Sequence, residues 1–195
     1  MSEVINPILR QGDIVFDESD GIIGWAIRRV EGRSTHARAY VNHVALVTEA
    51  GPIFSSDPLE EAVILDAQPP RVSLERLSKY RGDLISIYRP LNLTPFQKQV
   101  LAGHAVAHYN GHLYGYSKIA LHYLGLARYA HLDTFPICSW TVAKPMEDLF
   151  GMTFGGPGGE ATPESMWDFC RNHPEFYEEV LRLGVLDNGV VTKKG

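Results

Sequence analysis

The chain has 195 residues, with 18 Lys and Arg against 23 Asp and Glu, which gives a formal net charge of −5. This length predicts a single domain, 1–195, that buries a core without disulfide or metal staples. The hydrophobic share of 45% excludes a disordered chain, and the mildly acidic balance argues against broad nucleic-acid binding.

The early part of the chain is rich in short β-type runs. Strands are predicted at 12–16, 43–47, 62–66 and 83–88. Residues 21–30 predict a helix, for which Asp17, Ser19 or Asp20 is available as the cap. Residues 73–77 are expected to start a short helix.

Helical patterns dominate the later part. Thr94-Pro95-Phe96-Gln97 has the form of a capping box, which opens a helix that runs through His108. Further helices are predicted at 117–126, at 138–150 with Pro145 as a kink or break, and from 162 onward. The polar end, 187–195, is expected to fray. Strands at the centre with segregated helices predict an α+β fold.

The chain carries no visible targeting or membrane signal. No basic segment followed by an apolar stretch opens it, and no apolar run approaches the ~18 residues of a spanning helix. Two cysteines, Cys138 and Cys170, are too few for a disulfide scaffold. A protein without an integral membrane segment, in the cytoplasm by default, is expected, and the oligomeric state is left open.

Cys138 stands where a short apolar approach meets the start of a predicted helix. The positive end of a helix dipole favours a thiolate over a thiol. A thiolate nucleophile still needs a base, and a third group that orients the base. His43 is the best candidate base, because it enters a short strand that the core must hold rigidly.

Two other groups invite a chemical interpretation. His104 and His108 share a helix face at a spacing that can hold zinc, but Ala105 replaces the Glu of the metalloprotease motif. A half-exposed helix surface is therefore favoured. Cys170 and His173 also share a face, and for Cys170 the role of a small buried hydrophobic residue is favoured.

Four short motifs follow one another along the chain: 12–16 (GDIVF), 42–47 (NHVALV), 65–67 with 73–77 (LDA, SLERL), and 111–116 (GHLYGY) leading to 137–139 (ICS). Together they resemble the circularly permuted branch of the NlpC-type papain-like cysteine peptidases. This is the YiiX/YaeF-like group, which is related to lecithin-retinol-acyltransferase-like proteins. The resemblance spans about 12–146, most of the chain.

The resemblance implies a small antiparallel sheet packed against helices, and a Cys-His-acid site in which His43 precedes Cys138. The resemblance implies that Asp66 is the acid of this site, because it matches the family's acidic residue before Ala. Glu49, at the solvent end of its strand, is the rival. Tyr114 matches the family's tyrosine before the nucleophile and is expected to donate to an oxyanion beside the Cys138 backbone N–H.

The sequence also departs from the family pattern. Asn42 replaces the usual Ser before His, Gly115 stands where Asp is common, and Trp140 replaces a frequent acidic residue. These changes lie beside the expected site and leave its three catalytic residue types in place. They bear on the preference for substrate.

The predicted function is a cysteine hydrolase that cleaves an amide or ester through an acyl-enzyme, with no metal or organic cofactor. The expected substrate is a peptide, a peptidoglycan fragment or a lipid-like molecule. A lipid acyltransferase or thioesterase-like enzyme and a non-catalytic binding module on the same fold are the alternatives. Residues 21–27 are a candidate acyl groove, although the core face of a helix is favoured there.

Overall fold

A computed structural model of the chain describes residues 4–5, 9–18, 41–51, 61–116, 136–157, 160–187 and 190–193. Its strands are β1 (Val4–Ile5), β2 (Ile14–Glu18), β3 (His43–Glu49), β4 (Val63–Gln68), β5 (Arg71–Arg76), β6 (Leu84–Pro90), β7 (Tyr177–Asp187) and β8 (Val190–Lys193). Its helices are the single turn η1 (Leu77–Tyr80), α3 (Pro95–Tyr109), α5 (Cys138–Phe150) and α6 (Pro163–Asn172). The predicted helices at 21–30 and 117–126 lie outside the described residues.

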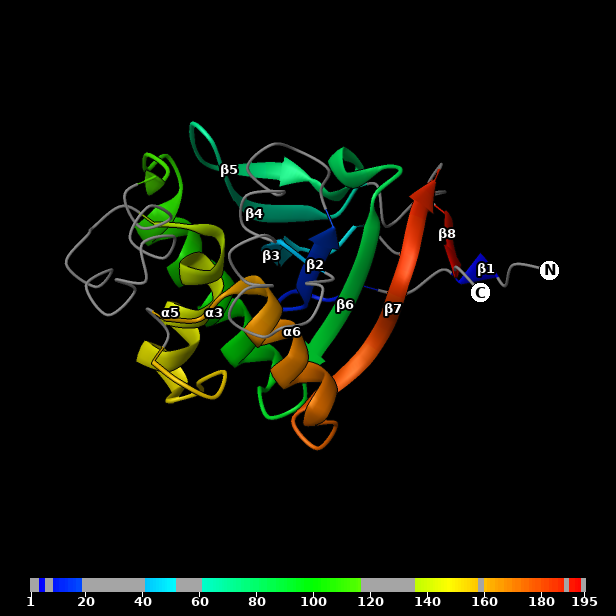
Figure 1. The fold of residues 1–195 in the computed structure, drawn as a ribbon. Coiled ribbons are helices and arrows are strands. Elements are labelled where there is room, and N and C mark those ends of the chain that lie inside the picture. The colour runs from blue at the N-terminus through cyan, green and yellow to red at the C-terminus, as the bar shows by residue number, and fades with distance from the viewer. Residues whose placement is uncertain are drawn as a thin grey trace.

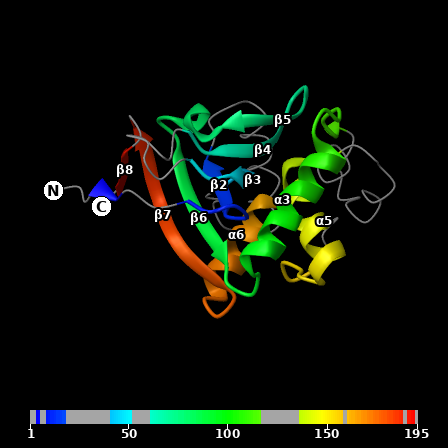
Figure 2. The ribbon, with the colours of Figure 1, turned by 180° about the vertical axis from the view of Figure 1, so that it is seen from behind.

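The described strands form one eight-stranded sheet in the order β1-β8-β7-β6-β2-β3-β4-β5, and every pairing is antiparallel. Helix α5 packs against β3 and β4, and both α3 and α6 contact α5. Figures 1 and 2 show the three helices gathered toward one end of the sheet, away from β1 and β8. The α+β class and the antiparallel sheet packed against helices are thereby confirmed.

The sheet is buried on both faces around β3. Successive side chains of a strand point to opposite faces. Val44 and Leu46 therefore join the core shared with the helices, while Ala45 and Val47 join a second core on the other face. Burial on both sides makes β3 a rigid support for the residue at its start, His43.

The capping box predicted at Thr94 is present at the start of α3. Thr94 Oγ1 accepts a hydrogen bond from the Gln97 backbone N–H at 3.3 Å, and Gln97 Oε1 accepts from the Thr94 N–H at 2.9 Å. The helix predicted at 138–150 is also present, and Pro145 lies inside it without ending it.

Residues 71–76 form β5, so the short helix does not start at Ser73 as predicted; the helical turn η1 begins only at Leu77. The strand pairs with β4 along its whole length, from Gln68↔Arg71 to Val63↔Arg76. Val72 is buried, whereas Leu74, which projects from the same face two residues further on, is exposed. Ladder bonds to β4 outweigh the weak local preference of Leu, Glu and Arg for helix.

The C-terminal strands are a second departure from the prediction. β7 was not expected, and β8 lies within 187–195, the segment predicted to fray. β8 pairs with β7 and also with β1, so 190–193 belongs to the sheet. A polar composition suits a strand near a sheet edge as well as a frayed tail. Among the described helices, none is both long and apolar enough to span a bilayer.

Candidate active site

His43 is held at the start of β3, between β2 and β4. The residue directly opposite His43 on β2 is Asp17. The backbone N–H of the neighbouring Asn42 donates to the Asp17 carbonyl at 3.0 Å. Only 5% of His43 is exposed. The imidazole therefore sits in a fixed, nearly dry position at the end of a central strand.

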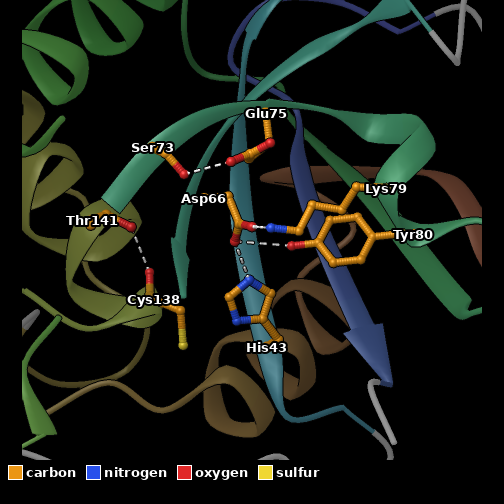
Figure 3. A network of polar contacts seen from close by, with 8 residues as sticks. All are labelled: His43, Asp66, Ser73, Glu75, Lys79, Tyr80, Cys138 and Thr141. Atoms are coloured by element: carbon orange, nitrogen blue, oxygen red, sulfur yellow. Dashed lines mark hydrogen bonds and ion pairs between the residues drawn. The ribbon is translucent and has the colours of Figure 1, made fainter. Parts of the chain in front are cut away.

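Asp66, on β4, accepts hydrogen bonds from three side chains. Its Oδ1 lies 2.6 Å from His43 Nε2 and 3.0 Å from the Tyr80 hydroxyl, and its Oδ2 pairs with Lys79 Nζ (Figure 3). The carboxyl is fully buried. Burial raises the pKa of Asp66, but the charges and hydrogen bonds of His43 and Lys79 outweigh it and lower the pKa to about 2. Asp66 is therefore an anion at neutral pH.

The charge of His43 is set by its two partners. Burial lowers its pKa, but the negative charges of Asp66 and Cys138, and the hydrogen bonds to them, hold the pKa well above its usual range. With Nε2 committed to Asp66, the other ring nitrogen, Nδ1, faces Cys138 (Figure 3). This arrangement favours an imidazolium between the Asp66 carboxylate and the Cys138 sulfur.

Cys138 is the first residue of α5 and is 2% exposed. The cap residue, Ile137, offers no side-chain hydrogen bond to the helix start, and the first turn contains no acidic residue. The Thr141 hydroxyl donates to the Cys138 carbonyl at 2.8 Å, which closes the first turn. The positive end of α5 is thus not offset by a carboxylate and acts on the Cys138 sulfur.

Tyr114 is brought to Cys138 by backbone pairing. Its own N–H donates to the Pro70 carbonyl at 3.0 Å, and the next N–H, of Gly115, donates to the Pro136 carbonyl at 2.8 Å. Burial raises the pKa of Tyr114 well above its usual value, and the charge of Cys138 and a side-chain hydrogen bond with Cys138 raise it further. Tyr114 is therefore a neutral phenol that donates toward the sulfur.

The structure thus brings together Cys138, His43, Asp66 and Tyr114, the four residues selected from the sequence. Glu49 is exposed at the opposite end of β3 from His43 and does not take the place of the acid. A buried thiol, an imidazole and a carboxylate in series, with a phenol beside the thiol, have the arrangement that nucleophilic acyl transfer requires.

The other candidate residues lie elsewhere. His104 and His108 stack at 3.8 Å between ring centroids on α3, and His108 Nδ1 contacts the His104 carbonyl at 2.9 Å. Cys170 is buried in α6, where burial raises the pKa of its thiol well above the usual range. The interpretations favoured for them, a helix surface and a buried hydrophobic residue, agree with these positions.

Three residues of the site were missed or misread. Lys79 and Tyr80 reach Asp66 from η1, just beyond the segment mistaken for a helix, and their residue types alone carry no signal. Asp17 was considered only as a helix cap. Extending the predicted strand 12–16 by one residue, beside the strand that starts at His43, would have found it.

The fold and site define an α+β protein with a Cys-His-Asp group at the junction of sheet and helix. No family model and no curated protein matches the sequence. Among solved structures, the chain is similar to metalloprotein yiiX from Escherichia coli O157:H7, a DUF1105 protein. The TM-score is 0.51 and the identity 15%, over 97% of this chain and 98% of that one. At this identity the similarity shows a shared fold alone, which confirms the YiiX-like fold.

Because yiiX is described as a metalloprotein, we tested whether the residues here fit a metal ion. Within the described ranges, no three His, Cys, Asp or Glu side chains gather as a metal site. Asp66 already accepts from His43, Lys79 and Tyr80, so His43 and Cys138 would be left as two donors. Structural and catalytic zinc sites use at least three protein ligands, and the described residues do not fit one.

Proposed function

We propose that the protein is a cysteine hydrolase of the permuted NlpC-type papain-like class, with 1–195 acting as one domain. The observation that carries the proposal is the position of His43, which contacts Asp66 through Nε2 at 2.6 Å and faces Cys138 with its other nitrogen. Packing alone does not require a buried histidine to lie between a carboxylate and a thiol. A histidine in this position is suited to proton transfer.

In the proposed reaction, the Cys138 thiolate attacks the carbonyl carbon of an amide or ester. The oxyanion that forms accepts hydrogen bonds from the Cys138 backbone N–H and the Tyr114 hydroxyl. The His43 imidazolium gives its proton to the leaving amine or alcohol, and the C–N or C–O bond breaks. Asp66 holds the ring orientation and stabilises its charge throughout.

The second half of the reaction regenerates the enzyme. Neutral His43 removes a proton from water, whose oxygen attacks the thioester carbonyl. The carbon–sulfur bond breaks, the carboxylic acid leaves, and the Cys138 thiolate and His43 imidazolium are restored. The proposed substrates are amides or esters of a cell-wall peptide or of a lipid-like molecule, as the sequence resemblance implies.

The test uses the full chain with p-nitrophenyl acetate, a lipid p-nitrophenyl ester and soluble peptidoglycan peptides. We expect a burst of p-nitrophenol and an acyl adduct that peptide mapping places on Cys138. Cys138→Ala should abolish both, while Cys170→Ala, the matched control, should leave both unchanged. Absence of an adduct on Cys138 with every substrate would favour the binding module instead.

Chelation provides a separate test of the chemistry. Because the proposed steps use a thiolate, an imidazole and hydrogen bonds, EDTA should leave the burst and the turnover unchanged. Loss of turnover in EDTA, restored by added zinc, would contradict the proposal and favour a metal-dependent reaction.

A further inference from the structure

Asp17 is a second buried carboxyl beside His43, which the proposed mechanism does not use. It lies on β2, opposite His43 on one side and opposite Ile85 of β6 on the other. The residue has no exposed surface, and neither carboxyl oxygen has a hydrogen-bond partner among the described residues. A buried carboxyl that accepts no hydrogen bonds is costly to ionise, so the presence of an aspartate at this position calls for an explanation.

The register fixes where this carboxyl lies. Directly opposed residues of antiparallel neighbours project from the same face of a sheet. Because β3 lies between β2 and β4, the imidazole of His43 has Asp17 on one side and Asp66 on the other. Asp66 contacts the ring directly, whereas Asp17 acts on it through space.

The groups that face Asp17 come from every neighbouring element. They are His43 on β3, Asp66 on β4, Tyr80 on η1 and Asp83 in the turn before β6; Glu18, the next residue of β2, projects from the other face but also acts on Asp17 through its charge. Burial raises the pKa of Asp17 to about 7; His43 lowers it, and the acidic neighbours raise it. Among these groups, the imidazolium of His43 is the one that favours the ionised form of Asp17.

We propose that Asp17 is a positioning residue for His43: its carboxylate, across the imidazole from Asp66, stabilises the imidazolium that partners the Cys138 thiolate. Protonation of Asp17 withdraws this support. The inference rests on the proposed function, for which it supplies a regulation by pH: the imidazolium persists to higher pH when Asp17 is ionised, and the two groups respond to each other.

The sign of the effect follows from the charges. A nearby anion raises the pKa of an imidazole, so removing Asp17 should lower that of His43. The titration midpoint of His43 should therefore move to lower pH in Asp17→Asn, by about one unit for a single buried charge. The loss of turnover on the alkaline side should move in the same direction.

The test follows the imidazole directly, so that it does not depend on turnover. The full chain, labelled with ¹⁵N-histidine and carrying Cys138→Ala, is titrated by NMR, and the His43 signal is assigned by its loss in His43→Gln. Asp17→Asn on this background should lower the midpoint. Glu18→Gln removes a carboxylate from the adjacent residue, which faces the opposite side of the strand, and should have a much smaller effect.

An unchanged or raised His43 midpoint in Asp17→Asn overturns the inference. If that variant does not fold, the carboxyl carbon of Asp17 is followed by ¹³C NMR in the otherwise unchanged chain. Titration near neutrality, moved upward by His43→Gln, supports the inference, and titration near the ordinary value of ~3.9 overturns it. If the His43 midpoint moves as expected but the unsubstituted chain shows no turnover, the role of Asp17 is supported and only the proposed hydrolase function is contradicted.

Discussion

Tyr80 donates its hydroxyl, at 3.0 Å, to Asp66 Oδ1, the same oxygen that contacts His43, while Lys79 takes Oδ2. The carboxylate is thereby fixed at both oxygens by residues of one helical turn, η1. A buried acid held in this way presents one lone pair to the imidazole in one orientation. The order of the site therefore depends on η1 as much as on the strands.

The two cysteines should differ sharply in reactivity. Both are almost fully buried, at 2% exposure for Cys138 and 1% for Cys170, so exposure does not separate them. Cys138 has an imidazolium and a helix start beside it, whereas burial raises the pKa of Cys170. Iodoacetamide at about pH 6, where an ordinary thiol of pKa ~8.5 is protonated, should modify Cys138 alone. Peptide mapping checks this, and equal slow labelling would contradict an activated thiol.

Replacement of the two candidate acids should separate their roles. Asp66→Asn removes the charge that stabilises the imidazolium, and kcat/KM should fall by as much as about 10⁴-fold. Glu49→Gln, at the exposed end of the same sheet region, should leave kcat/KM unchanged. The measurement is steady-state hydrolysis of the ester used above. Loss of turnover in Glu49→Gln alone would reverse the assignment.

Tyr114→Phe should lower kcat more than it changes KM. The phenol donates toward the reacting centre, and loss of one oxyanion donor costs about 100-fold in kcat. Tyr116→Phe is the matched control, because that ring lies 5.6 Å from the Tyr114 ring but is 55% exposed. Equal kinetic effects of the two substitutions would indicate packing, and would remove the hydroxyl of Tyr114 from the mechanism.

Lys79→Met should lower the free energy of unfolding and make the folded protein more sensitive to acid. The folded pKa of Asp66, about 2, lies below its unfolded value of ~3.9, so its contribution to stability is present above pH ~4 and lost toward pH ~2. Lys79 helps to lower that pKa, so its removal should start acid unfolding at a higher pH and cost on the order of 1–3 kcal/mol near neutrality.

Lys144→Met is the control for this change. Lys144 and Lys79 have side chains of equal exposure, 31%, but Lys144 pairs with the exposed Asp148, whereas Asp66 is fully buried. An exposed pair contributes about 0.5 kcal/mol. Urea unfolding from pH 3 to 8 compares the two variants. Similar losses of stability in both would show that burial of Asp66 does not strengthen its pair with Lys79.

Asp17→Asn should gain stability over the unsubstituted chain as the pH rises. The folded pKa of Asp17, about 7, lies above the unfolded value of ~3.9, so the unfolded state ionises first and stability is lost from pH ~4 to ~7. Asn removes this loss, and the difference between the chains should grow by on the order of 4 kcal/mol over that interval. Urea unfolding at each pH measures it. A difference that stays constant with pH would mean that Asp17 ionises as readily in the folded state as in the unfolded one.

The sequence allowed Cys138 and His43 to be paired because each stands at a recognisable boundary: one opens a helix, and the other opens a β-branched run. Asp66 and Tyr114 followed from the family resemblance. The same reasoning failed for β5, where Leu, Glu and Arg suggest a helix and only pairing with β4 decides otherwise. Contacts set by register, such as those of Asp17, depend on which strands are neighbours, which local patterns do not encode.

The hydrogen bond from Gly115 N to the Pro136 carbonyl, 2.8 Å long, joins the two ends of the segment between Tyr114 and Cys138. This hydrogen bond ties the backbone beside the phenol to the backbone beside the thiol, so Gly115→Pro, which removes the N–H that donates it, should move the two groups apart.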